Sequence, residues 1–282
     1  MIKKSEKYLV TGGTGVVGYK LCERILGMGG KVRVLSHGED NLKKLKDKYN
    51  EIEIVCGDIS NQQDVRDAMV DIKGVFHLAA VAEGMQSGKP LASIQTNIIG
   101  SIKVLLESTE TDFVLGVSSD KAVNVSGTYG ATKFLMEKLF AEFEEINPYT
   151  KYRVVRLGNV IYSHDSVLCK WKKLIESGDP VIITEPSATR FIITQDQSID
   201  LIFNCLEKST DSKPYTENMK STSMDNLLKA MIRKYCPSEI LISSVETIGL
   251  QQGENLHEKI TEDGLYSNET EQYTIEELEE II

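Results

Sequence analysis

The feature that most constrains this fold is a glycine-rich turn near the start of the chain, between a strand pattern and a helix pattern. Lys7 to Thr11 is an apolar run typical of a buried strand, and Gly12, Gly15 and Gly18 follow at three-residue spacing. Such glycines let the backbone turn tightly, approach a bound group and pack helix closely on strand. The helix pattern, which continues to about Gly27, would present amide donors and a positive partial charge. The turn therefore predicts binding of a dinucleotide through its pyrophosphate.

Short apolar runs alternate with helical patterns as far as about residue 160. The later runs cover residues 31–35, 52–55, 75–78, 113–117 and 152–157. Helical patterns begin near residue 62, extend over 90–108 and resume after the fifth run. This alternation predicts the α/β class, with a Rossmann-type doubly wound parallel sheet.

Beyond residue 160 the alternation loosens, which predicts a small C-terminal substrate-binding cap. Helices are expected over 167–177, 198–208 and 224–235, with an extended stretch at 181–184. We assign residues 1–160 to the dinucleotide-binding domain, with 191–210 returning to it, and 161–190 and 211–262 to the cap. Residues 263–282 are expected to form an acidic C-terminal tail, which either ends in a short helix or stays mobile.

The end of the second strand indicates which dinucleotide is bound. An NAD-preferring enzyme usually has an acid there that binds a ribose hydroxyl. This strand ends instead in Ser36 and His37, with Lys43 and Lys44 nearby, and the acids of residues 39–40 come later. We therefore predict NADP, with NAD as the alternative and a plain solvated loop as the reading without a ligand.

Other positions around the predicted cofactor leave alternatives open. Asp58 either meets the adenine edge or caps the helix that begins near Gln62. Asn97, inside an apolar-periodic helix, either braces the catalytic loop or lies at the surface. Small residues after the fourth strand would let a cofactor pass close to the backbone. The predicted cofactor-binding residues are Gly12, Thr14, Gly15, Val16, Val17, Gly18, Ser36, His37, Asp58, Ile59, Leu78, Ala79, Ala80, Asn97, Tyr129, Lys133 and Leu157.

The central stretch VSSDKAVNVSGTYGATK, residues 117–133, holds the candidate catalytic groups. Its serines, Asp120 and Lys121 emerge at the carboxyl end of a strand, where open α/β sheets place their ligands. Tyr129 and Lys133 are four residues apart, so they share one helix face. The lysine charge favours the phenolate, which could take a proton from a substrate hydroxyl. The predicted catalytic residues are Ser119, Asp120, Lys121, Tyr129 and Lys133.

Composition argues against several classes of protein. A net charge of -10 without a long basic cluster disfavours nucleic-acid binding, and no apolar run approaches membrane-spanning length. The five cysteines lack C-x-x-C spacing and the four histidines lack H-x-x-H spacing, so no metal site is expected. Without a signal-peptide core in MIKKSEKYLV, we expect a cytoplasmic protein.

With these residues in view, the chain resembles the extended short-chain dehydrogenase/reductases. Within them it is most similar to the UDP-N-acetylglucosamine 4,6-dehydratases of polysaccharide biosynthesis, over residues 8–260. The stretches that carry the resemblance are TGGTGVVG, SSDKAVN, YGATK, RLGNV, ATRFIIT and GENLHE. Asp120-Lys121 is the most specific of them, because most sugar epimerases of the superfamily lack that pair. Tyr129 places the chain nearer a short branch, similar to enzymes that also invert C5.

The resemblance implies a mechanism. Tyr129, assisted by Lys133 and Ser119, would deprotonate the C4 hydroxyl while the cofactor accepts hydride. Lys121 would then remove the C5 proton, and Asp120 would protonate the leaving C6 hydroxyl. Return of a proton to the opposite face would invert C5. The implied substrate-binding residues are Met85, Asn159, Ser166, Val167, Arg190 and Glu258.

Two charge expectations accompany these roles. As a base, Lys121 needs a lowered pKa, and Asp120 must hold a proton in a poorly hydrated site. The alternative is a solvent-exposed ion pair between the two. For Arg190, an arginine suits a diphosphate, and the alternative is an ordinary surface arginine.

Three functions follow from the sequence, in order of preference. The first is a UDP-N-acetylglucosamine 4,6-dehydratase with possible C5 epimerisation, in surface glycan synthesis. The second is a nucleotide-sugar C4 epimerase or 4-keto reductase on the same fold, and the third is a non-enzymatic NADP-binding regulatory protein. The expected partners are a UDP-sugar and other copies of the chain. The resemblance implies a homodimer or higher homo-oligomer that pairs the helices around Asn97 and Lys133.

Overall fold

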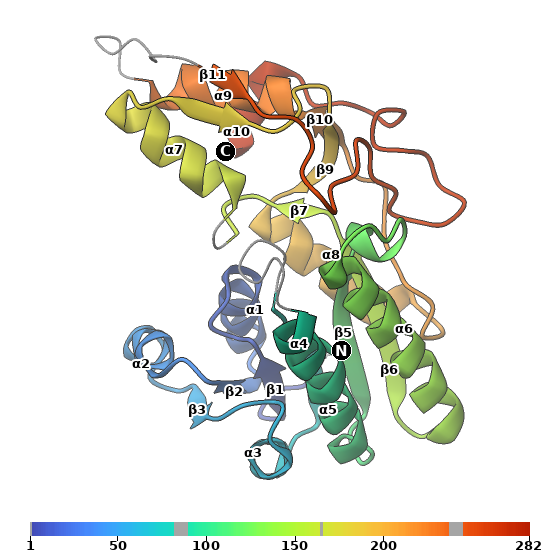
Figure 1. The fold of residues 1–282 in the computed structure, drawn as a ribbon. Coiled ribbons are helices and arrows are strands. Elements are labelled where there is room, and N and C mark those ends of the chain that lie inside the picture. The colour runs from blue at the N-terminus through green and yellow to red at the C-terminus, as the bar shows by residue number, and fades with distance from the viewer. Residues whose placement is uncertain (1, 82–89, 164–165, 237–244) are drawn as a thin grey trace.

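A computed structural model describes residues 2–81, 90–163, 166–236 and 245–282. Its central sheet has six parallel strands in the order β3-β2-β1-β4-β5-β6. The strands are β1 (Lys7–Thr11), β2 (Lys31–Ser36), β3 (Glu53–Cys56), β4 (Gly74–His77), β5 (Phe113–Ser119) and β6 (Lys151–Leu157). The order reverses between β1 and β4, which is the switch point of a doubly wound sheet. The predicted Rossmann-type α/β fold is confirmed (Figure 1).

Helices cover both faces of the sheet. One layer contains α1 (Val16–Gly27), α2 (Glu39–Lys48) and α8 (Gln195–Lys208). The other contains α3 (Gln62–Met69), α4 (Pro90–Ser93), the π-helical turn η1 (Ile94–Gly100), α5 (Ser101–Glu107) and α6 (Thr128–Ile146). Neighbouring strand residues point to opposite faces. Val10 accordingly packs under α1 and α8, whereas Leu9 packs under α3, α5 and α6.

Helix α2 follows the second strand after a short connection at residues 37–38. Glu39 and Asp40 lie in its first turn, where a helix dipole favours negative charge. Leu42 and Leu45 are buried, so the helix is held against the sheet by an apolar face.

The cap is built from short elements after residue 158. They are β7 (Asn159–Val160), α7 (Val167–Ser177), β8 (Val181–Ile183), β9 (Thr189–Ile193), β10 (Ser221–Ser223), α9 (Met224–Tyr235), β11 (Val245–Thr247) and α10 (Ile275–Ile281). Strands β10, β9 and β7 form one small sheet, and β11 pairs with β8. Trp171, Leu227 and Leu278 share a separate buried cluster. Figure 1 shows the cap helices α7, α9 and α10 gathered at one end of the molecule.

The acidic C-terminal stretch is ordered in the cap. Helix α10 packs against α9 through buried Leu278. Arg233 Nη1 on α9 lies 3.0 Å from Glu276 Oε1 and 3.4 Å from Glu279 Oε1. Of the two alternatives for this stretch, the structure has the short helix, since apolar residues interrupt the acidic run at helical spacing.

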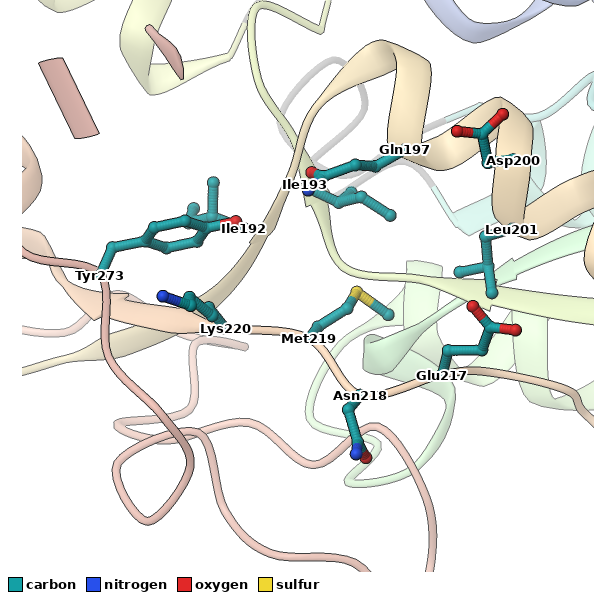
Figure 2. Close-up of a pocket in the computed structure, with 10 residues that line it drawn as sticks. All are labelled: Ile192, Ile193, Gln197, Asp200, Leu201, Glu217, Asn218, Met219, Lys220 and Tyr273. Atoms are coloured by element: carbon teal, nitrogen blue, oxygen red, sulfur yellow. The ribbon is translucent and has the colours of Figure 1, made fainter. Parts of the chain in front are cut away.

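A cavity of about 360 Å³ lies between α8, β9 and residues 217–220 (Figure 2). Its charged side chains already have partners: Lys220 pairs with Glu271 and Glu277, and Asp200 pairs with Arg24. None of the predicted site residues lines it. We therefore do not assign the active site there.

Candidate active site

The glycine turn has a geometry that only glycine permits. Gly12 has a φ of +69°, and a Cβ there would lie 2.8 Å from Ala79 Cα. A Cβ on Gly18 would lie 2.7 Å from Gly13 Cα, so close packing of α1 on the turn requires glycine. Gly15 is the N-cap of α1, and no side chain caps the amides of the first helical turn there. These residues fit the pyrophosphate of a dinucleotide.

Strand β2 ends in Ser36, whose hydroxyl lies beside the glycine turn. Ser36 Oγ lies 3.1 Å from Thr14 Oγ1. Glu39, the nearest acid along the chain, has its carboxylate 3.9 Å from the Cys56 thiol. The arrangement is therefore compatible with a cofactor that carries a 2′-phosphate, because no carboxylate is hydrogen-bonded beside Ser36 among the described contacts.

Asp58 does not cap α3. Its Oδ1 accepts the Ser60 backbone N–H at 2.7 Å, whereas Asn61 is the N-cap and accepts from Gln63 N. Ile59 is buried, and its side chain fills the space beside Gly100. The capping alternative for Asp58 was wrong because the cap position lies three residues further along.

Asn97 is buried in η1, so the surface alternative was wrong. Its amide accepts the Val81 N–H at 2.7 Å, and donates to Val81 O at 3.1 Å and to Thr132 Oγ1 at 2.9 Å. It thus ties the segment after β4, where Leu78 to Ala80 pass the glycine turn, to helix α6. The residue that it braces is Val81 rather than the loop at Asp120.

His77 supports the same region, although the sequence analysis did not single it out. Burial, with a contribution from the Lys133 charge, lowers the pKa of His77 to about 3, so the ring is neutral. Ser101 Oγ donates to Asn97 O at 2.7 Å. His77 Nε2 must therefore donate to Ser101, and Nδ1 accepts from Thr11 Oγ1 at 2.8 Å. A single histidine in an apolar strand gave no signal of this role.

The end of β5 delivers Ser119 and Asp120 to the site. Ser119 Oγ donates to Asp120 Oδ1 at 2.8 Å and accepts the Lys121 N–H at 3.3 Å, which begins a 3₁₀ turn. The proton of the Ser119 hydroxyl is thus directed to Asp120. The expected assistance of Tyr129 by Ser119 would require this hydroxyl to change its partner.

Tyr129 and Lys133 lie one turn apart on α6, as their spacing predicts. Tyr129 lines the main cavity, and Lys133 Nζ lies 6.0 Å from the centroid of its ring. Lys133 is buried and donates to Val117 O at 2.7 Å. Burial lowers the pKa of Lys133 to about 8, and the charge of Glu137 opposes that shift.

Lys121 is clamped between two buried carboxylates. Its Nζ lies 3.2 Å from Asp120 Oδ2 and 3.1 Å from Glu258 Oε1, and the Asp120 and Glu258 side chains are only 2% and 1% exposed. Burial and the charge of Arg190 act to lower the pKa of Lys121, but the two carboxylates outweigh them and raise it. The expected lowered pKa is wrong for this structure. The alternative of a solvent-exposed ion pair is also wrong, because a second acid from a distant segment closes the site.

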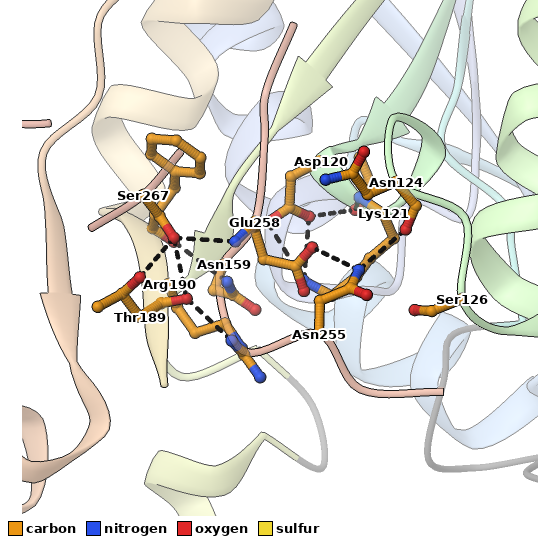
Figure 3. A network of polar contacts seen from close by, with 12 residues as sticks. Asp120, Lys121, Asn124, Ser126, Asn159, Thr189, Arg190, Asn255, Glu258 and Ser267 are labelled. Atoms are coloured by element: carbon orange, nitrogen blue, oxygen red, sulfur yellow. Dashed lines mark hydrogen bonds and ion pairs between the residues drawn. The ribbon is translucent and has the colours of Figure 1, made fainter. Parts of the chain in front are cut away.

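The segment that carries Glu258 joins the catalytic loop to the cap. On one side, Ser126 Oγ donates to Gly253 O at 2.7 Å and Asn255 Nδ2 donates to Asn124 O at 2.9 Å. On the other, Thr189 N donates to Leu256 O at 2.9 Å. Figure 3 shows Glu258 placed between Lys121 and the residues of β9. The segment therefore forms one wall of the site.

The main cavity has a volume of about 540 Å³ and lies where β5, α6 and the cap meet. Asp120, Lys121 and Tyr129 line it, and so do all but one of the predicted substrate-binding residues: Asn159, Ser166, Val167, Arg190 and Glu258. Met85 lies outside the described residues. Arg190 donates to Thr189 O and Leu256 O while facing the cavity, so it is not an ordinary surface arginine. The sequence analysis missed the apolar wall from the cap: Trp171, Ile182, Met224 and Leu227.

Comparison with known proteins agrees with this geometry. The polysaccharide biosynthesis protein family matches residues 8–279. The chain belongs to this family. A relative in Campylobacter jejuni, UDP-N-acetylglucosamine 4,6-dehydratase (inverting), is 30% identical over 260 residues, covering 89% of this chain and 75% of its own. A UDP-glucose 4-epimerase of Rickettsia bellii is also 30% identical, over 89% of this chain and 76% of its own. The family thus includes nucleotide-sugar dehydratases and epimerases.

Solved structures match the family fold. Pen from Bacillus thuringiensis superposes with a TM-score of 0.86 at 30% identity, covering 92% of this chain and 84% of its own. A dTDP-glucose 4,6-dehydratase from Streptomyces venezuelae, solved with NAD and TYD bound, has a TM-score of 0.78 at 18% identity, over 89% and 86% of the two chains. At that identity the second likeness concerns the fold alone. Both place the chain among short-chain dehydrogenase/reductase folds.

One relative corrects the expectation of a cytoplasmic protein. It is named an uncharacterized membrane protein of Methanocaldococcus jannaschii, and it is 31% identical over 293 residues, 99% of this chain and 85% of its own. That name contradicts the expected location, which we withdraw. In the described part of the chain, no helix is both long and apolar enough to cross a membrane.

Proposed function

We propose that this chain is a UDP-N-acetylglucosamine 4,6-dehydratase that uses NADP and makes a UDP-6-deoxy-4-keto hexosamine for surface glycans. The observation that carries the proposal is the ion pair of buried Asp120 and partly buried Lys121, which lines one cavity together with Tyr129. Oxidation and reduction at C4 need only the tyrosine and lysine of α6. Loss of water across C5 and C6 needs two further proton-transfer groups, and this pair supplies them.

Tyr129 is the proposed base for the C4 hydroxyl. A bound nicotinamide supplies the acceptor and donor of hydride. With a pKa of about 8, Lys133 is mostly cationic at neutral pH, and its charge favours the phenolate form of Tyr129. The tyrosine can then take the hydroxyl proton as the C4 carbonyl forms.

Asp120 and Lys121 are the proposed proton-transfer pair for elimination. To act as base and acid, Lys121 and Asp120 must both be neutral, whereas both are charged in the ion pair. A proton must therefore pass from Lys121 to Asp120 across their 3.2 Å contact before C5 is deprotonated. Lys121 then takes the C5 proton and Asp120 gives its proton to the departing C6 hydroxyl, so the pair ends as it began. Return of the hydride taken from C4 to C6, and of a proton to C5, completes the 6-deoxy-4-keto product without consuming reductant; delivery of that proton to the other face of C5 would invert that carbon.

The remaining residues are proposed to hold the nucleotide sugar. Arg190 is suited to the diphosphate, with Asn159 beside it and Ser166 and Val167 at the start of α7. Glu258 reaches the sugar only if its contact with Lys121 rearranges. We favour NADP over NAD because β2 ends in Ser36, a hydroxyl that does not repel a 2′-phosphate. Calorimetry should find tighter binding of NADP, and a clear preference for NAD would contradict this.

The second candidate is a C4 epimerase, favoured by the equal identity of the Rickettsia relative. Incubation of the purified protein with UDP-N-acetylglucosamine in heavy water separates the two. A dehydratase product loses one water without added reductant and carries deuterium at C5. An epimer keeps its mass, and a 4-keto reductase consumes NADPH. Lys121→Ala should stall before water is lost, and normal release of the 6-deoxy-4-keto sugar by this variant would show that Lys121 is not the base.

A further inference from the structure

Arg156 is a buried arginine that the proposed chemistry does not use. It lies on β6, opposite Ser118 on β5, and its side chain is 1% exposed. Its Nε donates to Glu137 Oε1 at 2.8 Å, and Nη2 donates to Glu137 Oε2 and Glu262 Oε1, both at 2.7 Å. Its Nη1 donates to Ile260 O at 3.2 Å and Glu262 Oε2 at 3.1 Å. All five N–H donors of the guanidinium are therefore used, which a lysine could not reproduce.

The first partner of Arg156 is one helical turn from Lys133. Glu137 is buried on α6 and also accepts a hydrogen bond from Ser118 Oγ at 2.6 Å. Its two oxygens are thus occupied by Arg156 and Ser118. Lys133 donates to Val117 O instead, and no ion pair between Lys133 and Glu137 occurs within the described ranges. Without Arg156, the closest cation for a buried Glu137 carboxylate would be Lys133.

The second set of partners follows Glu258 in the chain. Residues 258–267 double back as a short hairpin, in which Ser267 N donates to Glu258 O at 2.8 Å and Lys259 bridges to Tyr266. Arg156 binds Ile260 and Glu262 within this hairpin. Arg156 therefore anchors the segment that holds Glu258 against Lys121.

We propose that Arg156 is a positioning residue for both active-site lysines: it keeps Glu137 from pairing with Lys133, and it anchors the hairpin that holds Glu258 on Lys121. The effect of this positioning on turnover rests on the proposed function, whereas the contacts of Arg156 do not depend on it. The charged groups facing Lys121 are Asp120, Glu258 and Arg190. Beside Lys133 lie the Glu137 carboxylate, the neutral His77 ring and the phenol of Tyr129. Arg156 thus controls one acid beside each lysine.

Titration of lysines labelled with ¹³C at Cε, followed by NMR in the full chain, tests this without substrate. Signals are assigned with Lys121→Arg and Lys133→Arg. In Arg156→Lys, the pKa of Lys133 should rise above its wild-type value near 8, because Glu137 gains a free oxygen. The pKa of Lys121 should fall, because Glu258 is released. A folded variant in which both lysines titrate as in wild type would overturn the proposal.

A second variant tests the anchoring of the hairpin separately from the pairing with Glu137. It also covers the case in which Arg156→Lys does not fold. Glu262→Ala removes a carboxylate that is 65% exposed, so the fold should tolerate it. The pKa of Lys121 should fall while that of Lys133 stays unchanged, since Glu137 keeps Arg156. Glu271→Ala, an exposed acid that pairs with Lys220, is the matched control and should change neither. An unchanged Lys121 in Glu262→Ala would refute the anchoring role. Because no sugar is present, failure of the dehydratase proposal would leave this result standing.

Discussion

At the scale of single residues, the site depends on where each proton donor is directed. Tyr129 lines the cavity, Lys133 donates a hydrogen bond to Val117 O, and the Ser119 hydroxyl donates to Asp120. Lys121 is a cation between two acids. These five groups thus form two sets: Tyr129 and Lys133 on α6 for C4, and Ser119, Asp120 and Lys121 at the end of β5 for C5 and C6.

The α6 set gives the prediction at this scale. Tyr129→Phe should keep the fold and cofactor binding but lose oxidation at C4, because the phenol oxygen is the only group removed. General-base contributions are of order 10²–10⁴-fold. Single-turnover assays that follow cofactor reduction should therefore show a loss in that range, with an unchanged affinity for the cofactor by calorimetry. Near-normal turnover would rule out the role.

At the scale of elements, the π-helical turn η1 is the part that the sequence pattern could not distinguish from an α-helix. Its wider winding places Asn97 against the segment after β4, where the side chain binds both backbone groups of Val81. Hydrophobic periodicity reports which face of a helix is buried, but it does not register a single extra residue in one turn.

Asn97→Ala should destabilise the fold by about 2–3 kcal/mol, since the partly buried backbone donor and acceptor of Val81 each lose a partner and so does buried Thr132. Urea unfolding measures the change. Asn61→Ala is the matched control, because Asn61 accepts one hydrogen bond at an exposed N-cap, where the loss is about 1 kcal/mol. Equal losses in the two variants would contradict the bracing role of Asn97.

At the scale of the whole molecule, an apolar surface runs over α4, η1, α5 and α6. Leu91, Ile94, Leu106 and Leu135 are 75%, 44%, 51% and 50% exposed. We propose that two copies of the chain pair this surface, as the resemblance to the family implies. Leu135→Glu should then convert a dimer to a monomer in analytical ultracentrifugation, whereas Val70→Glu, at a position that is 55% exposed outside this surface, should not. A wild-type protein that sediments as a monomer at micromolar concentration would contradict the proposed pairing.

The sequence by itself determined the sheet, the glycine turn and the pairing of Tyr129 with Lys133, because each depends on a local pattern: continuous apolar runs for the buried strands, four-residue spacing on one helix face, and three-residue spacing between the glycines. Only the tertiary structure decided the charge environment of Lys121. Glu258 belongs to a segment far from the catalytic stretch, and no periodicity connects it to that stretch. Asp120 and Glu258 flank the Lys121 ammonium at a site largely out of water, where electrostatic effects are strong, so the folded chain reversed the expected direction of the Lys121 pKa shift.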